Sequence, residues 1–450
     1  MVLRCPKGLA VSLGAAVLGF ATLSLALTRS GESASGAQRG NLDLEAWRKV
    51  FARPTHVPNP PDNPPSAAKV ALGERLFNDR ALSVTGRVAC ATCHDPTLAL
   101  TDGVAKGAGV TGVRLRRNTP SLWNLAWSPL LYWDGRARSL EDQAKFPLEH
   151  ADEMGARIDD VAEKLQHDES YARAFREAFP DEPRVTGANM LKAIASFERS
   201  IVSPPTRFDR WIEGDATSLT PDEIDGFKLF VGKGQCVNCH TGFAFTDRSF
   251  HDIGLPDDDL GRGPILGLPR INHGFKTPGL RELAWTAPYM HDGSKPTLEA
   301  VIEHYAGGFV RRQTLSADLN QNLKLSEKEK ANLVAFLMTL SSENPPRPAS
   351  LSSRIERLGG AVGPAVPASQ IGQKGKRFTP EHVRLKAGER LKIFNDDTRT
   401  HNVRIDDPRM TVNSGAQEPG DAVEILFSKT GTFAATCGIH PTMRLEVEVQ

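Results

Sequence analysis

Apolar residues recur with a helical period through most of the chain. Leu72, Leu76 and Phe77 share one face of a segment that ends shortly before a pair of cysteines. Farther on, Thr220 to Glu223 form a capping box with proline at the first helical position, which predicts the start of a second such helix. The same period predicts helices over residues 156–178, 186–202 and 326–341.

The pattern changes after Ser342. Residues 344–374 are rich in proline, glycine, alanine and serine, a composition that predicts a linker. Beyond it, apolar and polar residues alternate, as in the run at 445–449, and turn residues separate short segments. We expect a small all-β antiparallel sandwich over residues 375–450. Its strands are predicted over 383–385, 390–394, 401–405, 422–427, 431–436 and 443–449.

The first 37 residues have the pattern of an export signal. Arg4 and Lys7 precede an apolar run over residues 9–27, and small residues follow at 33–37. We expect a signal peptide at residues 1–37 and a periplasmic location. An uncleaved N-terminal anchor is the alternative, because about 19 residues at about 1.5 Å each nearly span the apolar core of a bilayer. This anchor would be the expected contact with a membrane.

Composition narrows the classes of function. The 450 residues suffice for about three domains, and 40% hydrophobic against 24% charged residues is typical of folded protein. Lys and Arg exceed Asp and Glu by 55 − 54 = 1, so the sequence lacks the basic footprint of a nucleic-acid-binding protein. Six cysteines are too few for a disulfide scaffold of this length.

Two segments, residues 90–94 and 236–240, read Cys-x-x-Cys-His. Two thiols at this spacing bind the vinyl groups of a haem, and the adjacent histidine ligates the iron. A single zinc site is the alternative, but 142 residues separate Cys93 from Cys236, whereas zinc ribbons place about 15–20 between their halves. We therefore expect two covalently bound haem c groups. The attachment residues are Cys90, Cys93, Cys236 and Cys239, and the iron ligands are His94 and His240.

The last cysteine belongs to a third motif. Cys437, His440 and Met443 stand three residues apart, and His401 lies upstream on a predicted strand. One thiolate, two imidazoles and a weak axial thioether make the ligand set of a type 1 copper site. A buried free cysteine with surface histidines and a packing methionine is the alternative. The segment resembles a cupredoxin, with a tight ligand loop most similar to that of amicyanin.

From about residue 45 to 343 the sequence resembles the bacterial dihaem cytochrome c peroxidases and, in one respect, the MauG-type dihaem enzymes. The resemblance implies two mainly α, cytochrome c-like haem domains, a peroxidatic one at 45–213 and an electron-transfer one at 214–343. Besides the haem motifs it is carried by Arg-Asn-Thr-Pro-Ser-Leu-Trp-Asn at 117–124, Trp-Asp-Gly-Arg-Ala at 133–137, Lys-Thr-Pro-Gly-Leu-Arg at 276–281 and Ala-Pro-Tyr-Met-His-Asp-Gly-Ser at 287–294.

The resemblance also assigns roles outside the haem motifs. Gln143 and Glu153 match the distal pocket of the peroxidatic haem, where a carboxylate can carry the peroxide proton to the leaving oxygen. Trp133 matches an indole that passes electrons between the haems. The ligands of an inter-domain Ca²⁺ ion, two of them through backbone carbonyl oxygens, are matched by Asn118, Thr286 and Pro288.

Two positions depart from the usual pattern of the peroxidases. Many of them close the peroxidatic haem with a second histidine about 16 residues after the proximal one, where this chain has Val110, so we expect an open haem. Tyr305 stands where a methionine of the peroxidases usually ligates the second haem. The MauG type also has a tyrosine at this place. A phenolate favours Fe(III), whereas a thioether favours Fe(II). Met290 and His304 remain alternative ligands.

These features favour a periplasmic dihaem peroxidase that reduces hydrogen peroxide to water. Electrons would come from a small redox protein, a cytochrome c or a cupredoxin, and pass through the tethered copper domain and the second haem. The alternative is a MauG-type oxidase that uses high-valent iron to oxidise Trp or Tyr side chains of a partner protein. A non-catalytic electron carrier is a third hypothesis, disfavoured by Val110 and Glu153. The direction of electron flow and homodimer formation stay open.

Overall fold

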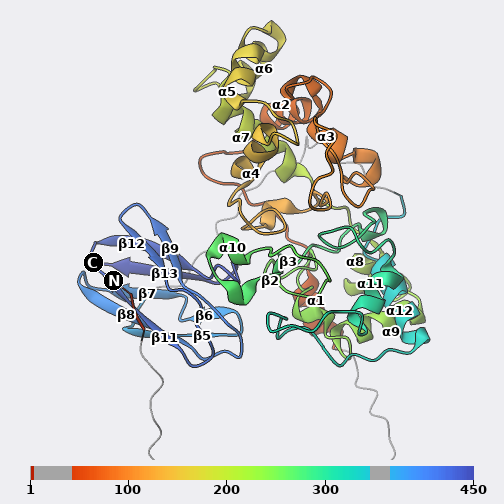
Figure 1. Cartoon of the computed structure of the whole chain (residues 1–450), viewed down its shortest axis with the longest axis vertical. Helices are drawn as coiled ribbons and strands as arrows, with labels where there is room; N and C mark the ends of the chain where they lie inside the picture. Colours follow the sequence, from red (N-terminus) through yellow and green to blue (C-terminus); the bar gives the residue numbers. More distant parts are fainter. Residues whose placement is uncertain (1, 5–42, 345–364) are drawn as a thin grey trace, which may run out of the picture.

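The computed structural model describes residues 2–4, 43–344 and 365–450. Residues 43–344, the helical region, are mainly helices and loops, and residues 365–450, the β domain, are strands (Figure 1). Of the expected signal peptide, the described part is Val2–Arg4, strand β1 at the edge of a sheet of the β domain; the rest lies outside the described residues. No described helix is long and apolar enough to cross a bilayer.

The helical region is built twice on one plan. The helix before each haem motif packs on a later helix, α2 on α7 and α9 on α12. A Cβ at Gly73 would overlap the carbonyl oxygen of Ala193, and a Cβ at Gly226 would overlap that of Asn332. The backbones can approach this closely because glycine has no side chain. The helices are α1 (Leu44–Phe51), α2 (Ala67–Asn78), α3 (Cys90–Cys93), α4 (Leu140–Glu149), α5 (Ile158–Gln166), α6 (Glu169–Ala178), α7 (Gly187–Ser200), α8 (Arg207–Ile212), α9 (Pro221–Val231), α10 (Gly263–Leu266), α11 (Leu298–Tyr305) and α12 (Glu327–Met338).

The segment 156–178, expected as one helix, is two helices, α5 and α6. The break falls at Asp168, whose carboxylate accepts hydrogen bonds from the amides of Ser170 and Tyr171 and so caps α6. The predicted capping box at Thr220 is present and starts α9, and a further capping box, of Ser326 with Glu329, starts α12. Local capping chemistry therefore decides where these helices begin.

The β domain consists of two sheets that enclose an apolar core. One sheet has the strand order β1-β11-β8-β5-β6 and the other β10-β9-β12-β13-β7-β4. Strands β2 (Phe250–His251) and β3 (Phe275–Lys276) pair within the helical region. The strands of the β domain are β4 (Val366–Pro367), β5 (Gln370–Lys374), β6 (Arg377–Thr379), β7 (His382–Leu385), β8 (Glu389–Asn395), β9 (Arg404–Asp407), β10 (Met410–Asn413), β11 (Ala422–Phe427), β12 (Gly431–Thr436) and β13 (Arg444–Val449).

Three expectations about the β domain were wrong in detail. The expected linker 344–374 contains β4 and β5, and β5 lies inside its sheet, between β8 and β6. Strand β5 has one large apolar residue, Ile371, and a single such residue gives no detectable alternation of apolar and polar positions. The strand expected from 401 begins at Arg404. Pairing is mixed rather than purely antiparallel, because β5–β8, β7–β13 and β4–β7 are parallel.

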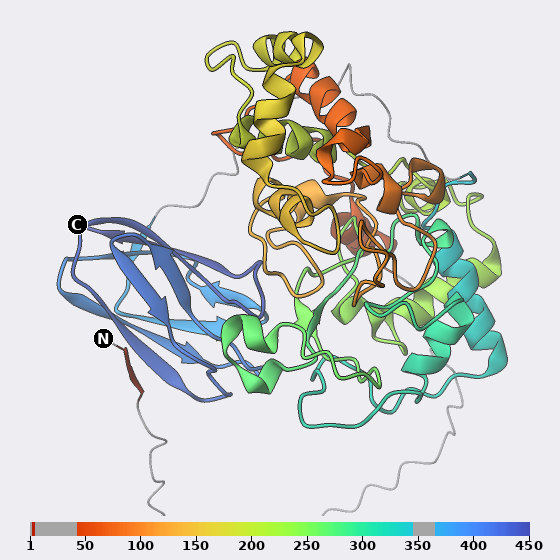
Figure 2. The ribbon, with the colours of Figure 1, turned by 45° about the horizontal axis from the view of Figure 1, so that its top comes forward.

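The β domain is docked on the helical region through α10. Leu266 of α10 and the nearby Leu268 belong to the same apolar core as Cys437, Ile439 and Met443. Figure 2 shows α10, in green, against the end of the blue β domain. This shared core places the candidate copper ligands at the boundary between the two parts of the molecule.

Candidate active site and metal centre

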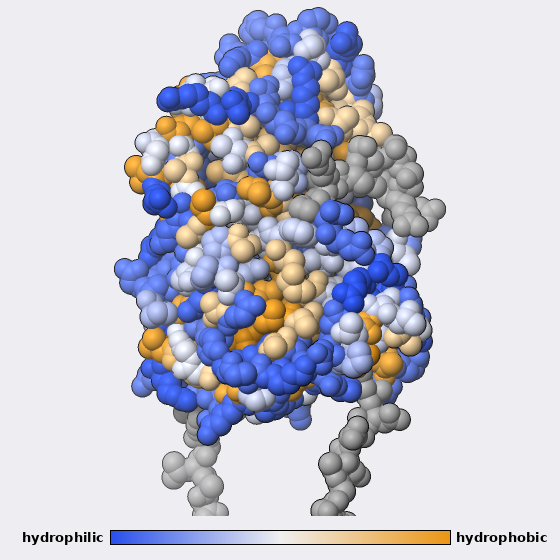
Figure 3. All heavy atoms as spheres, turned by 90° about the vertical axis from the view of Figure 1, so that its right-hand side faces the viewer, coloured by the Kyte–Doolittle hydropathy of each residue, from blue (hydrophilic) through white to orange (hydrophobic). Residues whose placement is uncertain are grey.

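Both Cys-x-x-Cys-His motifs line one cavity of the helical region, with a volume of about 910 Å³. The first motif lies on α3, and the second begins in a short 3₁₀ turn over Cys236–Asn238. Figure 3 shows a depression with apolar side chains on one side of the molecule, surrounded by hydrophilic residues. The lining includes all four predicted attachment residues, Cys90, Cys93, Cys236 and Cys239.

The histidines of the two motifs are held in the same way. Nδ1 of His94 lies 3.0 Å from the carbonyl oxygen of Leu100, and Nδ1 of His240 lies 3.0 Å from that of Phe245. A carbonyl only accepts, so each ring carries its proton on Nδ1 and keeps Nε2 for a metal. Leu100 and Phe245 have φ of 65° and 54°, a strained conformation that persists at both sites. Burial lowers the pKa of both histidines, which keeps them in the neutral form that ligates iron.

The two predicted distal residues line this cavity. Gln143 lies on α4, and its amide nitrogen is 3.4 Å from the hydroxyl of Tyr132. Glu153 lies in the following loop, where its carbonyl oxygen accepts a hydrogen bond of 2.9 Å from the amide of Val110. Burial raises the pKa of the Glu153 carboxyl, which suits a group that takes up and releases protons.

Sequence reasoning missed a second acid in this cavity. Glu198 of α7 lines it and is 5% exposed. Burial raises the pKa of Glu198 to about 8, and its Oε2 has no hydrogen-bond partner within the described residues. A signal was available in the sequence, because Glu198 stands one helical turn after the apolar Ile194. A carboxyl at this position of the predicted helix 186–202 therefore had to face the interior.

Trp133 stands at the junction of the two halves of the helical region and lines the cavity. Its indole N–H donates to the carbonyl oxygen of Asn118 at 2.9 Å, and its own carbonyl accepts from the amide of Lys276 at 2.8 Å. The ring centroid lies 6.4 Å from that of His291. Contacts from both halves thus fix the indole in one orientation.

The three candidate ligands of the second haem differ in placement. Tyr305, the last residue of α11, and Met290 line the cavity. His304 is not among the lining residues, and its Nε2 lies 2.9 Å from the carbonyl oxygen of Ile253. Burial raises the pKa of the Tyr305 phenol. This geometry disfavours His304 and leaves Tyr305 and Met290.

The three predicted calcium ligands also line the cavity and come from both halves of the helical region. The side-chain amide of Asn118 donates to the carbonyl oxygen of Val104 at 3.0 Å, and the hydroxyl of Thr286 donates to that of Leu283 at 3.4 Å. Calcium binding by Asn118, Thr286 and Pro288 remains a prediction.

In the β domain, three of the four predicted copper ligands converge. Sγ of Cys437 lies 3.8 Å from Nδ1 of His401 and 3.7 Å from Nδ1 of His440, and the two Nδ1 atoms are 3.0 Å apart. Cys437 and His401 are 0% exposed and His440 is 3% exposed. Met443 is buried in the same core, and its carbonyl oxygen accepts from the amide of Cys437.

The surroundings of this cluster fit a metal better than a free thiol. Two imidazole nitrogens point at one buried sulfur, and a soft thiolate with imidazoles suits copper. Nε2 of His401 lies 3.2 Å from Oδ2 of Asp397, which orients the ring. The amide of Gly438 donates to Oδ1 of Asn402 at 2.6 Å and fixes the loop after Cys437. Three donor side chains of the predicted set therefore face one another in the protein.

Comparison with known proteins identifies the family. The family described as di-haem cytochrome c peroxidase matches residues 67–217. The methylamine utilization protein MauG of Methylorubrum extorquens is 44% identical over 319 residues, which cover 70% of this chain and 90% of that protein. The chain belongs to the di-haem cytochrome c peroxidase family, which includes MauG.

Other members agree with this assignment. The cytochrome c551 peroxidase of Nitrosomonas europaea is 33% identical over 289 residues, covering 63% of this chain and 82% of the relative. A crystal structure of a MauG-like protein associated with microbial copper homeostasis has 33% identity and a TM-score of 0.60, and covers 68% of this chain and 97% of that one. Membership makes this di-haem protein a haem-dependent oxidoreductase and supports two haem c groups.

Proposed function

We propose that the protein is a periplasmic dihaem peroxidase that reduces hydrogen peroxide to water and receives electrons through its own copper domain. The observation that carries the proposal is the buried cluster of Cys437, His401 and His440, docked on the helical region that holds the haem cavity. A one-electron metal site in the same chain acts as a built-in redox partner. In this proposal the haem domains span 45–213 and 214–343, and the cupredoxin-like domain begins at about residue 365.

The peroxidatic haem would be attached to Cys90 and Cys93, with His94 as its iron ligand. The second haem would be attached to Cys236 and Cys239, with His240 as its iron ligand. When bound, the first haem supplies the iron at which the O–O bond is reduced. The balance is H₂O₂ + 2 H⁺ + 2 e⁻ → 2 H₂O. Glu153 takes the proton from the near oxygen of peroxide and gives it to the far oxygen, which leaves as water instead of hydroxide. Gln143 orients the peroxide by a hydrogen bond.

A second candidate function rests on Tyr305. The phenol lines the cavity near the second haem motif, and a phenolate ligand stabilises oxidised iron. Such a centre suits a MauG-type oxidase that removes electrons from Trp or Tyr side chains of a partner protein. The 44% identity to the M. extorquens MauG makes this the leading alternative.

Two substitutions separate these functions. We expect Cys437→Ser to abolish the thiolate–copper absorption. It should lower peroxide turnover with a reduced small cytochrome or cupredoxin by about a hundredfold, because the tethered site is lost. A small artificial donor that reaches the haem directly should still support turnover. The peroxidase proposal expects Tyr305→Met to keep or raise turnover, since a thioether favours Fe(II).

The measurement is steady-state peroxide consumption with both donor types. Negligible turnover in the wild type, together with loss of oxidation of a partner protein in Tyr305→Met, would establish the oxidase instead. Equal turnover of wild type and Cys437→Ser with the protein donor would exclude the copper domain as the entry point of electrons.

The ferric protein as isolated should show high-spin haem and react with peroxide without prior reduction. The reason is Val110, which offers no iron ligand and whose amide is bonded to the carbonyl oxygen of Glu153. Electron paramagnetic resonance of the ferric protein tests this. His150, the exposed imidazole that lines the same cavity, gives the control: His150→Ala should leave the spectrum unchanged. A bis-histidine low-spin signal from the first haem would contradict the expectation.

A further inference from the structure

The ligand loop of the β domain, residues 437–443, is covered by the chain itself. Leu266 of α10 packs against this loop, so close that a Cβ at Gly438 would lie 3.0 Å from its Cδ1. The amide of Phe250 in β2 donates to the carbonyl oxygen of Ile439 at 3.3 Å. In this arrangement the start of the loop, where Cys437, Ile439 and His440 are buried, faces the helical region.

One buried side chain joins this loop to Trp133. Arg262, 3% exposed, donates from Nε to the carbonyl oxygen of Gly438 at 2.8 Å. Its Nη1 donates to the carbonyl oxygens of Asp134 at 2.7 Å and Gly135 at 2.8 Å. Gly438 follows the candidate ligand Cys437, and Asp134 follows Trp133. The guanidinium therefore connects the backbone beside the thiol to the backbone beside the indole.

The neighbours of Arg262 fix this bridge. Its guanidinium carbon lies 4.2 Å from the ring centroid of Phe250, a cation–π contact. Gly135 has a φ of 68°, and a Cβ there would overlap the Phe250 ring. Only glycine allows the turn after Trp133 to approach Arg262 this closely. Three carbonyl oxygens and one aromatic ring thus determine the position of a single side chain.

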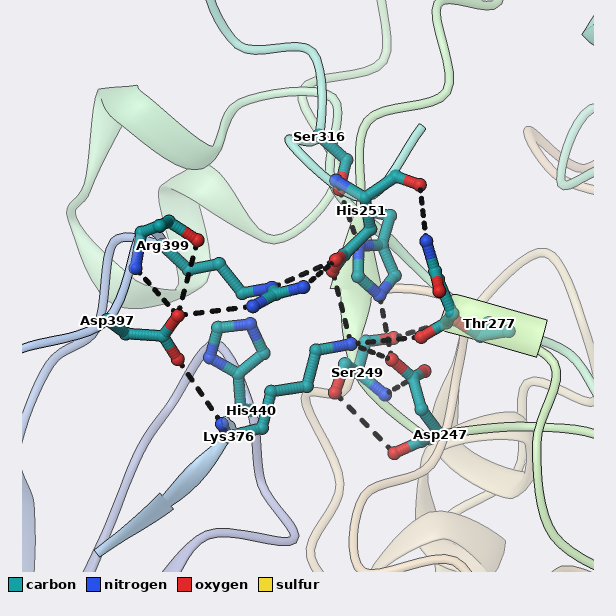
Figure 4. A network of polar contacts seen from close by, with 12 residues as sticks. Asp247, Ser249, His251, Thr277, Ser316, Lys376, Asp397, Arg399 and His440 are labelled. Atoms are coloured by element: carbon teal, nitrogen blue, oxygen red, sulfur yellow. Dashed lines mark hydrogen bonds and ion pairs between the residues drawn. The ribbon is translucent and has the colours of Figure 1, made fainter. Parts of the chain in front are cut away.

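A second contact holds the β domain to the region of the second haem motif (Figure 4). Nζ of Lys376 lies 2.8 Å from Oδ2 of Asp247 and 3.1 Å from Oδ2 of Asp318. Arg399 joins Asp318 to Asp397. Asp247 also contacts the buried ring of His251 at 2.9 Å. This network carries ion pairs and one backbone hydrogen bond, from Nζ of Lys376 to the carbonyl oxygen of Asn238 in the second haem motif at 3.2 Å. The Arg262 bridge carries hydrogen bonds to the backbone beside Cys437 and Trp133.

We propose that Arg262 is a positioning residue that couples the ligand loop 437–443 to Trp133. The β domain then exchanges electrons with the dihaem unit at Trp133, and the Lys376–Arg399 network only docks the domain. Trp133 gives up one electron to the peroxidatic side and regains one from the β domain, twice for each peroxide. A reduced cytochrome or cupredoxin supplies both electrons. This inference rests on the proposed function.

The test compares Arg262→Met, Arg262→Lys and Lys376→Met in the full chain loaded with both haems and copper. Protein with its copper reduced and its haems oxidised is mixed rapidly with peroxide, and the growth of the thiolate–copper absorption is followed. We expect Arg262→Met to slow this growth clearly, because the ligand loop and the backbone beside Trp133 lose the side chain that bonds to both. Arg262→Lys should recover part of the rate, and Lys376→Met should stay near wild type.

Hydrogen exchange of the Phe250 amide, measured without peroxide, reports docking independently of turnover. If Arg262 and Lys376 serve docking alone, both methionine variants expose this amide and slow the copper signal equally, which overturns the proposal. An unchanged rate in Arg262→Met also overturns it, while the proposed function stands. A wild-type copper signal that does not respond to peroxide refutes the proposed function and this inference together. Should Arg262→Met not fold, the rate and exchange in Arg262→Lys decide between these outcomes.

Discussion

Replacing Glu153 by glutamine should lower kcat/KM for hydrogen peroxide by about 10²- to 10⁴-fold, the range for loss of a general acid–base group. Glutamine keeps the shape and one hydrogen-bonding oxygen but cannot accept the peroxide proton. The measurement is initial-rate kinetics with an artificial donor, so that electron entry through the β domain is not limiting. Glu149→Gln is the matched control, because Glu149 lies at the end of α4, is 40% exposed and pairs with Lys145.

The pH dependence gives this prediction a second readout. Burial raises the pKa of Glu153 above the ordinary value of 4.5. Because the carboxylate must be ionised to accept the peroxide proton, kcat/KM of the wild type should fall as the pH drops through this raised pKa. In Glu153→Gln that acid limb should disappear. An acid limb that persists unchanged in Glu153→Gln would assign the proton transfer to another group, such as the buried Glu198.

Signals that lie within a few neighbouring residues predicted most of the site. The haem motifs and the loop from Cys437 to Met443 are such signals, since their chemistry depends on spacing along the chain. The structure also brings His401 close to Cys437 and His440, as the predicted copper ligand set requires. The capping box at Thr220 likewise predicted where α9 begins.

Features that depend on distant contacts could not be predicted. Arg262 and Gly438 are 176 positions apart, and nothing near Arg262 in the sequence distinguishes it from a surface arginine. β5 was taken as linker because its place in the sheet is fixed by pairing with β8 and β6, not by its own composition. Glu198 is different, because its place one helical turn after Ile194 in the predicted helix 186–202 already indicated a carboxyl on the apolar face.

A buried ion pair in the helical region supports the second haem site. Arg281 donates to both carboxylate oxygens of Asp209 at 2.7 and 2.8 Å, and the two side chains are 1% and 2% exposed. Its Nε donates to the carbonyl oxygen of Phe243 at 2.7 Å. Two residues later, the carbonyl of Phe245 accepts from His240. Arg281 therefore fixes the loop that orients the proximal histidine of the second motif.

Arg281→Met should lower the free energy of unfolding of the helical region by about 3–5 kcal/mol, because Asp209 would keep a buried charge without its main partner. Urea unfolding followed by far-ultraviolet ellipticity measures this. Arg207→Met is the control: Arg207 pairs with Glu223 at 2.7 Å but is 35% exposed, so the loss should be about 1 kcal/mol or less. Adding Asp209→Asn to Arg281→Met should restore part of the stability, since the unpaired charge is removed. Equal losses of unfolding free energy in Arg281→Met and Arg207→Met would show that the buried pair does not support the loop. In that case the absorption of the second haem in Arg281→Met should match that of the wild type.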